Sequence, residues 1–205
     1  MKYEYYMIAG ERVAIPIPTC YRDCAELIKS DYFRHNGKRS SLFMIWLGGW
    51  SRTSVAFSFW FRLSQYKGWL YPLAKWRLHS FKKGYGLLIP SSVKVGYGLY
   101  IQHCFGTIIN KRAIIGNNVN IGQLTTIGSN LKRAALIGNS VYIGPGTSIV
   151  DDVEIASGSC IGAGAVVVKN VMKDTTVAGV PARTIATSGH PEYILHPWPL
   201  PKEVL

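Results

Sequence analysis

One histidine lies in an irregular stretch of an otherwise repetitive region of this 205-residue sequence. His103 stands in Gln102-His-Cys-Phe-Gly106, where the spacing between repeated aliphatic residues widens from six residues to eight. An isolated histidine is usually a surface residue without a role. A neutral imidazole is nevertheless a suitable general base for a hydroxyl group, and a backbone insertion of this kind re-aims side chains. We therefore predict a catalytic role for His103.

The repeat that must position His103 extends from residue 89 to residue 167. Aliphatic residues recur every six residues, usually followed by glycine, at 89, 95 and 101, from 109 to 127, and from 137 to 167. A hexapeptide period is typical of a β-solenoid, in which three hexads form one triangular coil and the aliphatic side chains stack inside. A β-sandwich would have longer turn spacings and alternate with period two. We therefore predict a mainly β chain folded as a parallel β-helix.

A second interruption lies further along the repeat. The step from Ile127 to Ile137 is ten residues, which leaves Ser129-Asn-Leu-Lys-Arg133 as a short protruding loop. Insertions in solenoids lie on the outside, often at the binding face. We expect this loop to lie beside the functional site.

The flanking sequence divides into two further parts. We expect residues 1–87 to form an N-terminal arm and helical cap, residues 88–187 the β-helix, and residues 188–205 a Pro-rich extended tail. Helical spacing covers residues 21–30, 41–65 with an interruption near Gly48-Gly49, and 70–82. Residues 1–20 are expected to form an arm or hairpin, and residues 31–38 a polar segment that ends in a glycine turn.

The aromatic region at residues 43–61 has two interpretations. The first is a helical cap that covers the open end of the solenoid or contacts a neighbouring subunit. The second is an interfacial membrane helix with basic flanks. We favour the cap. The sequence has no signal-peptide pattern and no apolar run long enough to span a bilayer, so we expect a cytoplasmic protein, with peripheral contact at the inner membrane face as the alternative.

The charge balance restricts the partners. Twenty-three basic and eleven acidic side chains give a net charge of +12, but no nucleic-acid-binding motif is present. An anionic cofactor, an acidic glycan or an anionic membrane surface explains the charge equally well. The four cysteines have no metal-site spacing, so we predict no metal and no nucleic-acid partner.

Four stretches carry a resemblance to a known family: Ser30-Asp-Tyr-Phe-Arg34 with Gly37-Lys38, Gly98-Leu-Tyr-Ile-Gln-His103, Ile108-Ile-Asn-Lys111 and Ala178-Gly-Val-Pro-Ala-Arg183. The hexads, the insertion that bears His103 and the last of these stretches resemble the left-handed β-helix acyltransferases, and the other three stretches carry the nearer resemblance. Within these, the serine acetyltransferase branch is nearer, and nearest are the capsule and exopolysaccharide O-acetyltransferases of the colanic acid type. The resemblance covers residues from about 23 to 186.

This resemblance implies a homotrimer, or a dimer of trimers, with active sites between neighbouring β-helices and acetyl-CoA as co-substrate. The residue matching His103 takes a proton from the acceptor hydroxyl, and backbone N–H groups stabilise the developing negative charge. The positions that match the cofactor path are Gly128, Ser129, Gly144, Pro145, Gly162 and Ala163, with Lys169, Lys173 and Arg183 as candidates for the cofactor phosphates. For the glycines, simple turn formation is the alternative role.

Acceptor-binding candidates are Asp31, Arg34 and Gln102. Asp31 matches an acidic residue that contacts the acceptor in the family; its alternative is a polar residue that ends a helix. Two positions depart from true serine acetyltransferases: Leu88 and Gln102 replace aspartates, so that Gln102, a backbone carbonyl or a neighbouring subunit must orient His103. The loop at 129–133 also lacks the second histidine of that branch.

These departures favour an O-acetyltransferase for a sugar or surface-polysaccharide precursor. Two alternatives stay open: a serine O-acetyltransferase of cysteine biosynthesis, and a non-enzymatic trimeric β-helix scaffold. A β-helix carbonic anhydrase needs three zinc-binding histidines, and the repeat region contains only His103.

Overall fold

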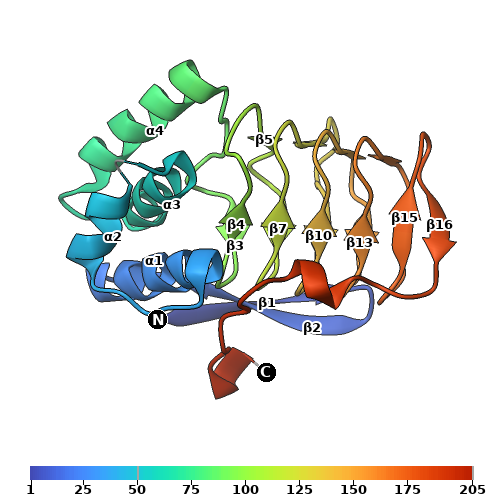
Figure 1. The fold of residues 1–205 in the computed structure, drawn as a ribbon, viewed down its shortest axis with the longest axis horizontal. Helices are drawn as coiled ribbons and strands as arrows, with labels where there is room; N and C mark the ends of the chain where they lie inside the picture. Colours follow the sequence, from blue (N-terminus) through green and yellow to red (C-terminus); the bar gives the residue numbers. More distant parts are fainter. Residues whose placement is uncertain (50, 205) are drawn as a thin grey trace.

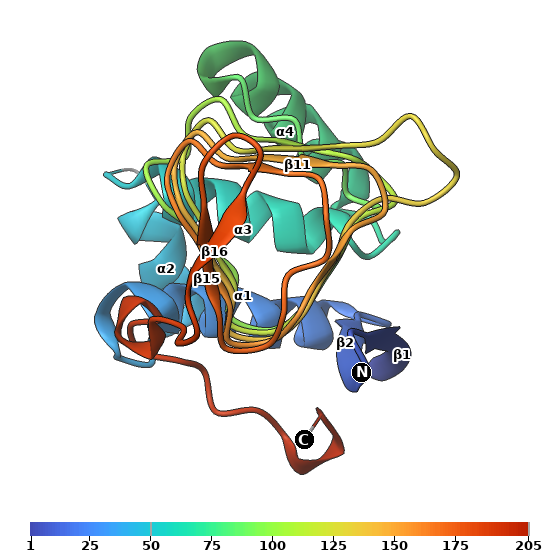
Figure 2. The ribbon, with the colours of Figure 1, turned by 90° about the vertical axis from the view of Figure 1, so that its right-hand side faces the viewer.

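The computed structural model describes residues 1–49 and 51–204. Trp50, which belongs to the predicted aromatic cap, and Leu205, the last residue of the predicted tail, lie outside the described residues. Residues 87–186 wind into a solenoid of short parallel strands, and the view along its axis is triangular (Figure 2). The predicted β-helix is therefore confirmed.

Three parallel sheets form the sides of the triangle. One contains β4 (Tyr100–Ile101), β7 (Asn120–Ile121), β10 (Tyr142–Ile143), β13 (Cys160–Ile161), β15 (Thr176–Ala178) and the antiparallel β16 (Arg183–Ala186). The second contains β5 (Ile108–Ile109), β8 (Thr126–Gly128), β11 (Ser148–Val150) and β14 (Val166–Val167). The third contains β3 (Lys94–Val95), β6 (Ile114–Ile115), β9 (Leu136–Ile137) and β12 (Glu154–Ile155).

The repeated aliphatic residues stack as the hexads predict. Ile101 pairs with Ile121, Ile121 with Ile143, and Ile143 with Ile161 along the first sheet. All four are at most 3% exposed. Both interruptions therefore lengthen a turn and leave the strand ladder intact. Figure 2 shows the longer turn, after β8, as a loop that projects far from the solenoid.

Helices cover the end of the solenoid where the first coil lies (Figure 1). They are α1 (Tyr21–Asn36), α2 (Leu42–Gly48), α3 (Thr53–Ser64) and α4 (Tyr71–Tyr85), and they follow a hairpin of β1 (Lys2–Ile8) and β2 (Glu11–Ile17). Phe57 and Phe61 of α3 and Phe81 of α4 belong to the same hydrophobic cluster as the coil residues Leu87 and Ile89. The helices thus bury the open end of the coil stack, which supports the cap interpretation.

Helix α1 extends six residues beyond its predicted end, which is a correction to the polar segment expected at 31–38. It ends at Asn36, and Gly37 adopts the left-handed conformation (φ 68°) that favours glycine after a helix. Asp31 and Arg34 look like surface residues in the sequence, but they are 1% and 2% exposed. Their hydrogen bonds to the solenoid, described below, place this polar face of the helix inside the protein.

The C-terminal segment runs back along the outside of the first sheet (Figure 1). The hydroxyl of Thr176 donates to Ser188 O (2.7 Å), and the amide of Asn120 donates to Tyr193 O (2.8 Å). Asn118 exchanges two hydrogen bonds with the backbone of Trp198 (3.1 and 2.8 Å). Two short 3₁₀ helices, η1 (Pro191–Tyr193) and η2 (Lys202–Val204), interrupt this tail.

Candidate active site

His103 is one of two residues that have no counterpart in the next coil. Gln102 N donates to Ile121 O (2.8 Å), and Leu124 N donates to Phe105 O (2.8 Å), so the chain is in register on both sides of this point. In the next coil, the same corner needs only Gly122 to Leu124, which is two residues fewer than Gln102 to Gly106. The insertion predicted from the sequence is therefore His103-Cys104.

The two inserted side chains point in opposite directions. Cys104 is 1% exposed and belongs to the core of the solenoid, and burial raises the pKa of its thiol to about 12. His103 is exposed, with a φ of 53° that non-glycine residues rarely adopt. It makes no hydrogen bond to residues 1–49 or 51–204 of its own chain. The insertion thus anchors a thiol inside and presents an imidazole outside.

Exposed apolar side chains lie on the chain segments next to the histidine. Phe105 and Leu124 lie at the same corner in successive coils, where Leu124 N donates to Phe105 O (2.8 Å), and their side chains are each 53% exposed. Leu88 takes the place of the aspartate expected to orient the base, and it pairs with Ile108 at the edge of the second sheet; they are 39% and 43% exposed. A cluster of this kind on one surface is typical of a protein interface.

Asp31 has a structural role. Its carboxylate pairs with Arg62 through two bonds, Nε to Oδ2 (2.7 Å) and Nη2 to Oδ1 (2.9 Å). It also accepts from Ser58 Oγ and from Leu99 N (2.8 Å). Because both oxygens are engaged and the side chain is buried, Asp31 fastens α1 and α3 to the first coil.

Arg34 and Gln102 do lie together. They line a cavity of about 220 Å³ on the outer side of the first sheet, with Tyr100, Asn120 and Tyr142. Arg34 donates to Gly98 O (2.7 Å), to Asn120 Oδ1 (2.6 Å) and to Leu195 O (2.8 Å). Burial lowers the pKa of its guanidinium to about 10, so Arg34 stays charged at neutral pH.

The tail closes this cavity, which sequence analysis missed. Glu192, Tyr193 and Leu195 form its outer wall. The Tyr193 ring lies 4.9 Å from that of Tyr142 and stacks on His190 at 4.7 Å. The Pro-rich composition indicated an extended tail, but no pattern in it identifies the surface it covers.

The cofactor candidates lie at two different corners of the solenoid. Gly144 and Pro145 follow β10, and Gly162 and Ala163 follow β13, so all four stack below the corner that bears His103. Gly128 ends β8, Ser129 follows it, and Lys169 lies after β14, at the corner between the second and third sheets. Arg183 begins β16 at the far end of the first sheet. One chain alone does not bring these residues into one groove.

Gly144 is needed for the turn itself. A Cβ at this position would lie 2.7 Å from Ala163 N and 2.9 Å from Ile161 O, both backbone atoms of the next coil. At Gly162 the nearest atom is the Ala178 methyl group, at 2.9 Å. Close packing of adjacent coils therefore explains why both positions are glycine.

The chain is similar to known proteins of one enzyme class. Residues 134–169 match the family model described as bacterial transferase hexapeptide (six repeats). The chain is 39% identical over 101 residues to serine acetyltransferase from Escherichia coli K12, a match that covers 47% of this chain and 37% of the relative. It is 32% identical over 108 residues to serine acetyltransferase from Bacillus licheniformis, where the shares are 51% and 50%. The chain thus spans half or less of the length of these curated relatives.

Solved structures extend the similarity to the helices. Serine acetyltransferase from Vibrio cholerae superposes with a TM-score of 0.63 at 28% identity, over 80% of this chain and 64% of that one. The soybean enzyme complexed with serine gives a TM-score of 0.55 at 28% identity, over 80% and 69%. The solenoid is therefore a left-handed β-helix, as predicted. These relatives support the serine acetyltransferase branch and give no support to the narrower resemblance to capsule O-acetyltransferases.

The described residues contain no group of three or more histidine, cysteine, aspartate or glutamate side chains arranged to hold a metal ion.

Proposed function

We propose that this chain transfers an acetyl group from acetyl-CoA to a hydroxyl, with His103 as the general base. The observation that carries the proposal is the two-residue insertion, which directs His103 outward. In the coils that follow, the same corner bears four of the predicted cofactor residues. The similarity to serine acetyltransferases supports the same chemistry.

The steps follow from the chemistry of a thioester. An imidazole nitrogen of His103 accepts the proton of the acceptor hydroxyl as that oxygen attacks the acetyl carbonyl carbon. The tetrahedral intermediate then collapses, the carbon–sulfur bond breaks, and the imidazolium returns the proton to the departing thiolate. Backbone N–H groups at the turn would stabilise the negatively charged oxygen of the intermediate. The Cys104 thiol takes no part, since its raised pKa keeps it neutral and its side chain is buried.

L-serine is the first candidate acceptor, because the relatives are named serine acetyltransferases. A sugar hydroxyl is the second, and it rests on the site itself. Gln102 and Leu88 stand where aspartates are expected, the loop at 129–133 carries no histidine, and the neighbouring cavity is lined by three tyrosines. Aromatic rings with amide and guanidinium donors form a surface suited to a hydroxylated ring.

An acceptor screen separates these candidates. We expect acetyl-CoA to release its thiol in the presence of L-serine and not with D-serine or with L-alanine, which lacks the hydroxyl. The measurement is thiol release followed colorimetrically, with the product identified by mass spectrometry. Turnover with nucleotide sugars and none with L-serine would assign the glycan as acceptor. No turnover with any hydroxyl compound would leave the scaffold interpretation.

We also propose that the site is completed between copies of this chain. Two sets of cofactor candidates lie at separate corners, and exposed apolar residues lie on the segments next to His103. Packing the His103 corner of one copy against the loop corner of another would join the two sets and bury Phe105 and Leu124. A threefold arrangement of such contacts closes on itself.

The oligomeric state tests this arrangement. We expect light scattering after size exclusion to give three times the 22.8 kDa chain mass, or a multiple of it. Leu124→Glu should yield smaller species, because it would bury an unpaired charge in the contact. Met172→Glu, a change at an equally apolar but 70% exposed residue near the last coil, should leave the mass unchanged. A monomeric parent protein would contradict the proposal.

A further inference from the structure

The charges of this chain are strongly segregated along the sequence. Residues 32–150 contain no aspartate or glutamate, although they contain fifteen of the lysines and arginines. Within this stretch, helices α2 to α4 and their turns carry Arg52, Lys67, Lys75, Arg77, Lys82 and Lys83 in addition to the buried Arg62. The charged side chains of α2 to α4 and of their turns are therefore all cationic.

The same end exposes a cluster of large apolar side chains. In α2, Phe43 is 65% exposed and Met44 55%, and this helix contains no charged residue. In α4, Trp76 is 61% and Leu73 44% exposed. We call this surface of α2 and α4 the helical face. Exposed aromatic and aliphatic side chains among lysines and arginines are typical of helices that lie at a membrane interface.

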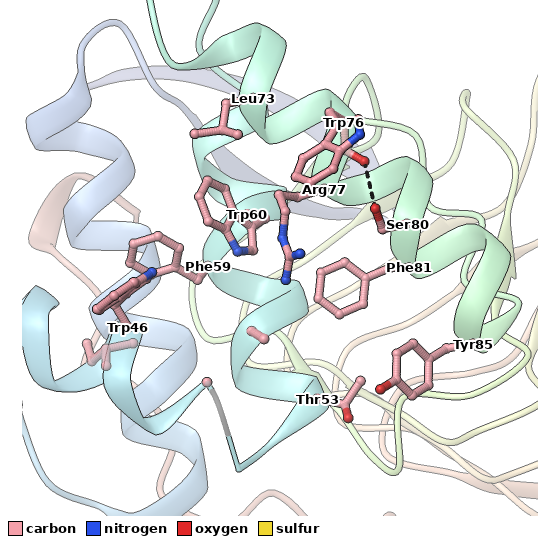
Figure 3. A pocket seen from close by; sticks show the side chains of 13 residues that line it. Trp46, Thr53, Phe59, Trp60, Leu73, Trp76, Arg77, Ser80, Phe81 and Tyr85 are labelled. Carbon is pink, nitrogen blue, oxygen red and sulfur yellow. Dashed lines mark hydrogen bonds between the residues drawn. The ribbon is translucent and has the colours of Figure 1, made fainter.

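A cavity opens between these helices (Figure 3). It has a volume of about 690 Å³, and Trp46, Trp60, Leu73 and Trp76 contribute to its mostly apolar walls. Arg77 reaches into it, with its guanidinium carbon 5.8 Å from the ring centroids of Trp60, Trp76 and Phe81. Arg77 has no carboxylate partner within residues 1–49 and 51–204. An apolar space that holds an unpaired cation suits an anion attached to a hydrocarbon chain.

We propose that the helical face docks onto the surface of an anionic bilayer, with lipid phosphate against the basic side chains and acyl chains against the apolar ones. Lipid phosphates near Arg77, Lys82 and Lys83 would supply the negative charges that this part of the chain lacks. A second copy fits the face less well, because two purely cationic surfaces repel each other. No described helix is both long and apolar enough to cross a bilayer, so the contact is peripheral.

Vesicle flotation with the full-length protein tests this proposal. We expect the protein to float with vesicles of phosphatidylglycerol and phosphatidylcholine in equal parts, and not with phosphatidylcholine alone. Phe43→Ser combined with Met44→Ser should reduce the bound fraction about tenfold or more, and so should Lys82→Gln combined with Lys83→Gln. All four side chains are exposed in the chain, so these changes leave the core intact.

Matched controls are available on the solenoid. Met172→Ser removes an exposed methionine, and Lys111→Gln removes one exposed positive charge; neither should alter flotation. His103→Ala should also float normally, so that a failed catalytic assignment and a failed docking assignment give different results. The proposal would be overturned by no flotation with anionic vesicles, or by flotation that the apolar substitutions leave unchanged. It would also be overturned if these substitutions lowered the mass of the protein in solution, which would assign the helical face to self-association.

Discussion

Replacing His103 with alanine is expected to lower acetyl transfer by about two to four orders of magnitude, which is the usual effect of removing a general base. The expectation rests on the placement of the ring. The ring is exposed and lies on a two-residue insertion. Four of the predicted cofactor residues lie at the same corner in the coils that follow. The strand ladder on both sides of the insertion is intact, so the variant should fold normally and still bind acetyl-CoA.

The measurement is steady-state thiol release with a saturating acceptor, beside a direct titration of acetyl-CoA binding. His79→Ala is the matched control, because His79 is also exposed but lies on α4, away from the insertion. It should retain parental turnover. Parental turnover in His103→Ala, with turnover otherwise established, would remove the catalytic assignment and leave the fold assignment untouched.

The largest expected loss of stability comes from Arg62→Ala. Arg62 is fully buried in α3 and donates to Asp31 as well as to Val95 O (3.0 Å) and Gly96 O (2.6 Å) of the first coil. Its removal leaves the Asp31 carboxylate buried without a cation. Removing one partner of a buried pair costs about 3–5 kcal/mol. For a chain of this size, that corresponds to a fall in Tm of roughly 6–20 °C.

Thermal unfolding monitored by circular dichroism measures this effect. Arg133→Ala is the matched control, because it breaks an ion pair to Asp152 (3.1 Å) in which the Arg133 side chain is 78% exposed. Exposed pairs contribute at most about 1 kcal/mol. The double variant Asp31→Leu with Arg62→Met should recover part of the loss, since it leaves no unpaired charge. Equal Tm values for Arg62→Ala and Arg133→Ala would contradict the role assigned to this pair.

Local patterns predicted the solenoid well, because every coil repeats the same short-range rule. The hexads place each aliphatic residue inside, and the two breaks in the step mark the insertion at His103-Cys104 and the loop after β8. The helical spacing likewise predicts α2, α3 and α4 and the break at Gly48-Gly49. These features depend on neighbours within a few residues of one another.

Contacts between distant segments were not predictable in the same way. Asp31 lies 31 residues from Arg62, and Arg34 lies 161 residues from Leu195. Composition marks such residues as surface polar groups, and nothing in the local pattern indicates that tertiary contacts bury them. The unexpected burial of Asp31, the underestimated length of α1 and the overlooked wall formed by the tail share this cause.

The insertion also bears on how such a site arises or disappears. Because His103-Cys104 lies between two turn positions that already match the neighbouring coil, excising both residues would restore the six-residue step and cost the core only one small thiol. The fold and its reactive group are thus separable by a single short deletion. A solenoid of this kind can lose its chemistry, or acquire it, while the rest of the architecture stays as it was.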